Sequence, residues 1–265
     1  MAITTLDGFI ASAKQRIPIC KTAGRTTVAN GWFSMFDLAG LPGAGTLAGS
    51  STSAGVVPDD TVAGYPSINA FGGGATGYLA RFEYGNTVSG RIDIFDRVWV
   101  GGADAFNATQ TLSAQPSYSA RMPGGSDYTG TEIWIEAVTA FTGNLSVAVT
   151  YTNQSGTTGH TTGTFATGNA LTVGRCMQLP FQAGDCGVQK IETVTGTVAT
   201  VGTFNVMVLR RLGSARVKIA NDGDVQDMLR CGLPQVFATS ALYALVCPDS
   251  TAIGVPDLNL LIANA

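Results

Sequence analysis

The sequence predicts an all-β protein, a jelly-roll-like antiparallel β-sandwich with a short N-terminal helix and an extended arm rich in Gly, Ala and Thr. Charged residues make up only 12% of the 265 residues, about half the usual share near 25%. Gly (34 residues) and Thr (32) are abundant, which is typical of strands and tight turns. A hydrophobic content of 45% excludes a disordered chain. With four Glu and four Lys, the sequence also lacks the charged faces of a helical bundle.

The first expected element is a helix at the N-terminus. Thr4 or Thr5 can cap it, and Pro18 would end it. Its apolar side chains recur at helical spacing: Leu6, Phe9, Ile10, Ala13 and Ile17. Residues 39–77 are dominated by small residues and Pro, which predicts an extended arm or long loop. We therefore expect 1–77 to form the helix and arm and 78–265 the sandwich, with one continuous domain as the alternative.

From residue 78 onward, apolar and polar residues alternate with the period-two pattern of half-buried strands. The expected strands are GYLARFEYG, SGRIDIFDRVWVGG, TEIWIEAVTAF, NLSVAVTYTNQSG, CMQLPF, VQKIETVTGTV, TFNVMVLRR, ARVKIA, ALYALVCPDS and LNLLIANA. No helical pattern separates them, so a doubly wound α/β fold is disfavoured. The apolar last run predicts that the C-terminus closes a sheet, either its own or a neighbour's.

The charge is unevenly distributed along the chain, whose net charge is −3. This sign argues against nucleic acid as a direct partner. The first thirty residues, however, hold four basic residues against Asp7 alone: Lys14, Arg16, Lys21 and Arg25. These four are the interface candidates for an acidic partner, and a solvated face is the alternative.

Two further patterns bear on location. No apolar run reaches the roughly 18 residues that span a bilayer, so we expect no membrane partner. The start, MAITTLDGFIASAKQR, does not have the pattern of a signal peptide. We therefore expect synthesis in a cytosol.

The sequence offers little for catalysis, and we expect no enzyme, no catalytic residue and no cofactor. His160 is the one histidine and lies in a Gly/Thr-rich connection, where an exposed loop histidine is the default interpretation. The glycines of FGGGATG match a dinucleotide-binding spacing, but a strand pattern follows them instead of the required helix.

Two carboxylates flank a tryptophan in one expected strand, at Glu132, Trp134 and Glu136. Residues four apart on a strand are roughly 13 Å apart, too far for a pair of glycosidase carboxylates. A glycan-binding platform on Trp134, or on Tyr118 and Tyr128, stays open beside a sheet face or subunit contact as the alternative.

Metal sites are also weakly indicated. NDGDVQD at 221–227 offers oxygen ligands that could hold calcium, although Asx-turn chemistry explains the same residues. One histidine and scattered cysteines do not provide a zinc site. The five cysteines, Cys20, Cys176, Cys186, Cys231 and Cys247, are expected as buried free thiols, with a Cys176–Cys186 pair as the alternative.

Several stretches resemble head-region virion proteins of tailed bacteriophages. They are VTYTNQSGTTGHTTG, MQLPFQAGDCGVQKIETVTGTVATVGTFNVMVLRRL and SALYALVCPDSTAIGVPDLNLLIANA, and the resemblance covers roughly residues 130–265. These phrases are similar to capsid cement or decoration proteins with a jelly-roll-like sandwich. The similar stretches are strand and turn sequences without a motif of site residues, so the resemblance assigns no functional residue to this chain.

The resemblance implies a non-enzymatic subunit that binds the major capsid protein, stabilises the capsid lattice from its exterior and forms a homotrimer. It implies synthesis in the cytoplasm of a bacterial host. Another virion part, such as a tail tube, head-completion or fibre subunit, is the nearest alternative. A glycan-binding module is the alternative from another class. The low charge fits a surface that becomes covered, because interface cores are depleted of charge.

Overall fold

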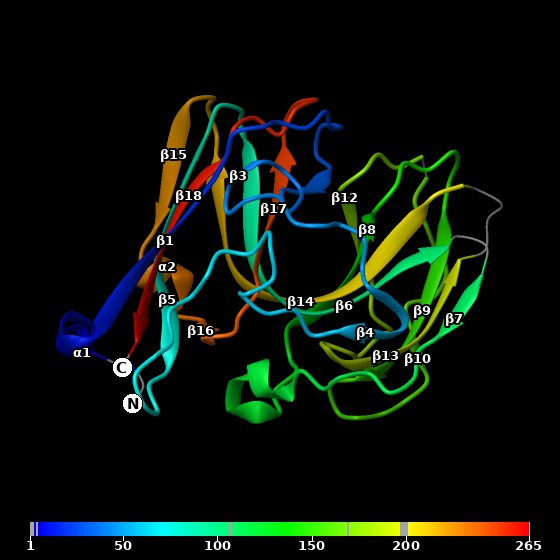
Figure 1. Cartoon of the computed structure of the whole chain (residues 1–265), viewed down its shortest axis with the longest axis horizontal. Helices are drawn as coiled ribbons and strands as arrows, with labels where there is room; N and C mark the ends of the chain where they lie inside the picture. Colours follow the sequence, from blue (N-terminus) through cyan, green and yellow to red (C-terminus); the bar gives the residue numbers. More distant parts are fainter. Residues whose placement is uncertain (1–2, 4, 106–107, 169, 197–200, 265) are drawn as a thin grey trace. The chain divides into compact units, whose positions relative to one another are not determined.

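The computed structural model describes residues 3, 5–105, 108–168, 170–196 and 201–264, and they are almost entirely β (Figure 1). The strands pair antiparallel, and a short helix precedes them, so the predicted fold class is confirmed. Contacts divide the chain into two compact units. Unit 1 holds residues 1–45, 59–96 and 212–265, and unit 2 holds 46–58 and 97–211. The expected boundary between an arm and a sandwich at 77 and 78 stays a prediction.

Unit 1 is built from α1 (Leu6–Ala11), β1 (Ala13–Lys21), β2 (Trp32–Ser34), β3 (Gly40–Leu41), β5 (Gly77–Asn86), β15 (Asp222–Gln226), α2 (Met228–Cys231), β16 (Gln235–Val236), β17 (Leu242–Pro248) and β18 (Asp257–Asn264), with parts of β6 (Gly90–Ala105) and β14 (Thr203–Val217). One sheet has the order β15-β5-β18-β1-β3, and β16 pairs with β5. A second layer pairs β17 with β2 and with the first half of β6. Apolar side chains from both layers form one buried core.

Unit 2 is built from β4 (Ser51–Val56), β7 (Thr109–Thr111), the 3-10 turns η1 (Ser119–Arg121) and η2 (Pro123–Gly125), β8 (Thr131–Ala137), β9 (Ser146–Asn153), β10 (His160–Thr161), β11 (Phe165–Ala166), β12 (Arg175–Leu179) and β13 (Val188–Gly196), with the remaining parts of β6 and β14. One sheet has the order β10-β9-β13-β7, with β11 on β9. The other layer contains β12-β8-β14. Its core is a second cluster of buried apolar side chains.

The N-terminal helix is shorter than predicted. Thr5 caps it by accepting a hydrogen bond from the Gly8 amide, and Thr4 lies outside the described residues. The helix ends at Ala11, and the expected helical continuation to residue 17 is wrong, because Ala13–Lys21 is β1. Pairing with β18 along eight residues outweighs the local helical spacing, and it buries Ile17 and Ile19 in the core.

The small-residue segment 39–77 is less detached than an arm. It holds β3 and β4, and it also buries Leu47, Tyr65 and Ile68. The segment predicted as an extended arm or long loop therefore also contributes side chains to the interior. The glycines matter here because a Cβ at Gly45 or Gly64 would collide with the ring of Phe36.

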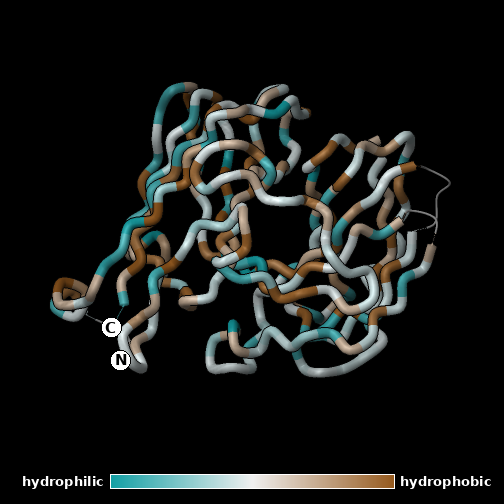
Figure 2. The backbone as a smooth tube through the Cα atoms, viewed as in Figure 1, coloured by the Kyte–Doolittle hydropathy of each residue, from teal (hydrophilic) through white to brown (hydrophobic). Residues whose placement is uncertain are grey.

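The structure merges two of the predicted strands and shows where the C-terminal strand pairs. TFNVMVLRR and ARVKIA are one long strand, β14, and the C-terminal strand β18 lies between β5 and β1 of its own chain. The second observation decides between the two alternatives that the sequence left open for the C-terminus. Figure 2 shows hydrophobic and hydrophilic residues alternating along the strands, as the period-two pattern requires.

Candidate functional site

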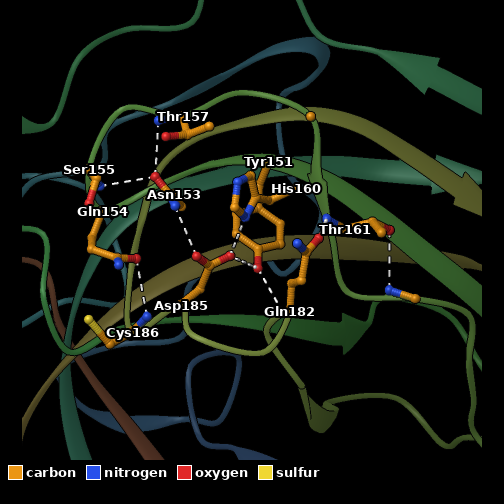
Figure 3. A network of polar contacts seen from close by, with 12 residues as sticks. Tyr151, Asn153, Gln154, Ser155, Thr157, His160, Thr161, Gln182, Asp185 and Cys186 are labelled. Carbon is orange, nitrogen blue, oxygen red and sulfur yellow. Dashed lines mark hydrogen bonds and ion pairs between the residues drawn. The ribbon is translucent and has the colours of Figure 1, made fainter.

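The densest polar cluster of unit 2 is centred on Asp185 (Figure 3). One carboxylate oxygen accepts from the Tyr151 hydroxyl at 2.7 Å and lies 2.7 Å from Nδ1 of His160. The other oxygen accepts from the Asn153 amide at 2.9 Å. The Tyr151 hydroxyl in turn accepts from the backbone amide of Gln182 at 2.9 Å. The cluster therefore ties the β9–β10 hairpin to the segment that follows β12.

The hydrogen bonds set the ionisation of this cluster. Burial acts to raise the pKa of Asp185, but the donors Tyr151, Asn153 and His160 outweigh it and lower the pKa below its ordinary value. Burial, followed by the hydrogen bond to Asp185, raises the pKa of Tyr151. Asp185 is thus held as a carboxylate and Tyr151 as a neutral donor near neutral pH.

His160 differs from the exposed loop residue that the sequence predicts. It begins β10, pairs with Tyr151 across β9, and its side chain is 20% exposed. An imidazole beside a carboxylate is two-thirds of a hydrolytic triad. Among the residues that the structure describes, however, no hydroxyl or thiol contacts Nε2 of His160. The contacts that the structure shows for the pair join β10 to Asp185.

A second polar cluster of unit 2 is fully buried. Arg97 and Glu136 lie 3.6 Å apart, with side chains 2% and 0% exposed. Asn205 donates to Glu136 at 3.0 Å and to the carbonyl oxygen of Leu47 at 2.6 Å. Since every one of these groups is away from water, the cluster holds strands together and offers no site for a ligand.

The glycan-platform alternative meets a direct obstacle. Trp134 is 1% exposed and Tyr118 is 3% exposed, so neither ring is available for stacking on a sugar, and that interpretation is wrong for both. Glu132 does lie on the same face as Trp134, because it accepts from the indole Nε1 at 2.7 Å. Tyr128 is half-buried and packs edge-on against Tyr118.

Asp104, near the end of β6, is a buried carboxyl group with an oxygen that has no hydrogen-bond partner among the described residues. Burial raises its pKa to about 7. Burying a carboxyl group without a hydrogen-bond partner costs free energy, because its interactions with water are not replaced.

The residues considered for metal binding are used otherwise. NDGDVQD forms β15 and the start of α2, where Asp224 accepts from Gln226 at 2.6 Å and Asp227 caps α2. Within the described ranges, no group of three or more His, Cys, Asp or Glu could hold a metal ion. No disulfide joins the five cysteines. Cys176 and Cys247 are buried as expected, Cys20 and Cys231 are half-buried, and Cys186 is exposed, contrary to the sequence expectation.

The four basic interface candidates divide into two pairs. Lys14 and Arg16 are exposed on β1, whereas Lys21 is buried and donates to the carbonyl oxygens of Leu38 and Pro42 at 3.1 and 2.8 Å. Burial lowers the pKa of Lys21. Arg25 is half-buried and paired with Asp37. The four side chains do not form one patch, and a docking role stays a prediction.

At the N-terminal end of unit 1, near Lys14 and Arg16, α1 exposes apolar side chains. No residue of α1 is buried, and Leu6 and Ile10 are 63% and 65% exposed. The Lys14 ammonium donates to the carbonyl oxygens of Ile10 and Ser12 and lies 4.8 Å from the Phe9 ring centre. Figure 1 shows α1 at the end of β1. We take this α1–β1 surface, Leu6–Pro18, as the candidate functional site.

The sequence did not reveal this surface, because a single helix through residue 17 was expected. The signal was present in Ile17 and Ile19, which alternate with Arg16 and Pro18 as in a strand.

The comparisons with known proteins leave the family open. No family model matches the chain, and no curated protein matches it. Matching solved structures include a mutant VP2 protein of infectious bursal disease virus in T=1 particles, at 12% identity and a TM-score of 0.16, covering 96% of this chain and 77% of that chain. The Gt strain of the same virus matches at 10% identity and 0.18, covering 96% and 81%. Similarity at these TM-scores carries no argument about fold or function.

Proposed function

We propose that the chain is a non-enzymatic virion structural protein, a cement or decoration subunit that stabilises the major capsid lattice of a tailed bacteriophage. The observation that carries this proposal is α1, a helix without a single buried residue that exposes Leu6 and Ile10. The sequence resemblance over residues 130–265 and the low charge content support it. Its proposed partners are the major capsid protein and further copies of itself, as a homotrimer on the capsid exterior.

The exposed helix is explained by a surface that covers it. Burying a large aliphatic side chain contributes about 1.5–3 kcal/mol relative to leaving it in water. A six-residue helix is too short to be stable by itself, yet α1 places two such side chains on its outer side. Contact with a capsid would bury both side chains. No described helix is long and apolar enough to cross a membrane.

The proposal is tested with purified particles from the source of the chain. Mass spectrometry should find the chain in them, and cryo-electron microscopy should place it on the head. Density on the tail instead would favour another virion part. Absence from particles would contradict the proposal.

The role of α1 is tested with a variant carrying Leu6→Ser and Ile10→Ser. Both side chains are mostly exposed, so we expect an unchanged Tm. We expect binding to particles that lack the protein to weaken at least about tenfold, because two apolar contacts are lost. Leu229→Ser is the matched control, since Leu229 is an 88% exposed leucine of the other helix in unit 1. Equal binding by all three proteins would contradict a contact through α1.

A further inference from the structure

The sheet of unit 1 ends in a strand whose outer backbone edge is only partly paired. β18 covers one edge of β1 from Ala13 to Cys20. On the other edge, β3 pairs with β1 only at Cys20 and Lys21 among the described residues. The segment from Lys14 to Pro18 therefore has an open edge, and we use this name for it below.

The direction of each backbone group on the open edge follows from the register. The Lys21 amide donates to Pro256 on the β18 side, and the Thr22 amide donates to Ala39 on the β3 side. Amides alternate between the two edges of an antiparallel strand. The amides of Lys14 and Arg16 therefore point outward, whereas those of Gln15 and Ile17 point to β18. The carbonyl groups of Lys14, Arg16 and Pro18 also point outward.

The open edge has room beside it. β3 ends at Leu41, and Pro42 follows, which has no amide hydrogen to continue a ladder. A groove of about 220 Å³ runs there, lined by Arg16, Ile17, Pro18, Leu41, Pro42, Pro66 and Ser67. The Gln15 side chain holds the neighbouring segment in place through two hydrogen bonds to the Asn69 backbone, at 2.9 and 3.3 Å. These bonds hold the Asn69 backbone near Gln15, beside the segment that contributes Pro66 and Ser67 to the groove.

The positive charges of Lys14 and Arg16 influence which strand can pair with the open edge. Lys14 and Arg16 lie two residues apart on the same outer face of the sheet. Directly opposite cross-strand residues are about 4.5–5.5 Å apart, where opposite charges stabilise and like charges destabilise. Pairing with the same edge of a second copy would bring these basic residues together. Edge Lys and Pro residues commonly guard sheets against such self-pairing.

We propose that the open edge of β1 accepts an extended acidic segment of a partner protein as an added strand, with carboxylates at alternate positions opposite Lys14 and Arg16. Backbone hydrogen bonds to the outward amides and carbonyls would hold the segment, and the carboxylates would select it. The proposal deepens the proposed function by naming the chemistry of the partner contact. It rests on that function only for the claim that the segment belongs to a virion protein.

The test uses the full chain and the peptide Thr-Glu-Thr-Glu-Thr-Glu-Thr. Binding is followed by NMR titration and residue-resolved amide hydrogen exchange. We expect saturable binding and new protection of the Lys14 and Arg16 amides, with little change at Gln15 and Ile17, which are already paired. A peptide that is N-methylated at alternate residues should bind at least about tenfold more weakly, because it loses the ladder hydrogen bonds.

Charge reversal tests the selection. Arg16→Glu should weaken binding of the glutamate peptide at least about tenfold and allow the chain to bind Thr-Lys-Thr-Lys-Thr-Lys-Thr. Lys218→Glu is the matched control, because Lys218 is an exposed lysine outside β1, and it should bind the glutamate peptide as the unaltered chain does. Binding without protection of the Lys14 and Arg16 amides, or equal loss in the control, would overturn the proposal.

The two proposals fail separately. Peptide binding by a chain that is absent from particles would leave the open edge established and remove the virion role. A particle-bound chain that ignores the peptide would do the reverse.

Discussion

In unit 2, the stability of the fold is sensitive to substitution of buried charged and polar residues. Glu136 and Arg97 are compensated by each other and by Asn205, whereas a carboxylate oxygen of Asp104 has no partner among the described residues. Removing one partner of a buried ion pair destabilises the folded state, because the other charge stays buried. A buried charge that has no partner destabilises the folded state as it stands. We therefore expect neutral substitutions at these two carboxylates to change the free energy of unfolding in opposite directions.

Asp104→Asn should stabilise the protein above pH 7. Burial raises the pKa of Asp104 to about 7 in the folded state, against about 3.9 in an unfolded chain. The folded state thus binds more protons between these values, and the free energy of unfolding falls as the pH rises from about 4 to 7. At pH 8 the variant should gain up to about 4 kcal/mol.

The measurement for Asp104 is Tm or chemical denaturation of both proteins at pH 5 and pH 8. The gain should be about 1.5 kcal/mol at pH 5 and reach its full value at pH 8. A variant with the same pH dependence as the unaltered chain would contradict the assignment.

Glu136→Gln should destabilise the protein by about 3–5 kcal/mol, because it removes the charge of one member of a buried ion pair. Glu132→Gln is the matched control on the same strand. Glu132 pairs with the exposed Arg211, and an exposed ion pair contributes about 1 kcal/mol or less. Denaturation curves of the two variants give the comparison, and equal losses would refute the distinction.

At the scale of elements, the Asp185 cluster fixes the β9–β10 hairpin. The hydrogen bonds from Tyr151, Asn153 and His160 lower the pKa of Asp185 in the folded state. Its stabilising contribution is therefore present above the unfolded pKa of about 4 and is lost as the pH falls through the lowered folded pKa.

Asp185→Asn should release the hairpin, since an amide cannot accept from three donors as a carboxylate does. We expect faster hydrogen exchange at hairpin amides such as Thr162, whose amide donates to Val149, with the core amides of unit 1 unchanged. The acid side of the stability curve should also become flatter. Unchanged exchange at Thr162 would show that the cluster does not hold the hairpin.

The elements show which signals in the sequence are reliable. The apolar runs ALYALVC and LNLLIAN predict β17 and β18. β17 is buried at every residue, whereas burial alternates along most of β18. The spacing of Leu6, Phe9 and Ile10 predicts α1, but the same spacing extended through Ala13 and Ile17 is wrong. The partner of residues 13–20 lies at 257–264, between 237 and 251 residues away, and a local pattern contains no information about it.

In the candidate site too, some residues could be identified from the sequence, whereas others depend on contacts with distant segments. Lys14 and Arg16 could be named from charge alone, and they are exposed. The inward turn of Lys21 could not, because it depends on the carbonyl groups of Leu38 and Pro42. The Asp185 cluster likewise joins residues from three segments, and only the turn at Asn153–Gly156 hinted at it in the sequence.

At the scale of the whole molecule, the all-β class that composition predicts is confirmed, and contacts divide the chain into two compact units with separate cores. The low charge content agrees with this, because two sandwiches need four inner sheet faces of apolar residues. It also agrees with surfaces such as α1 that a partner would cover. Composition alone does not distinguish these two uses of apolar residues.

The most direct measurement is cryo-electron microscopy of purified particles from the source of the chain. The account predicts density for this chain on the outer surface of the head, with Leu6 and Ile10 of α1 buried against a neighbouring protein. Particles without the chain, or a bound chain whose α1 faces solvent, would contradict it.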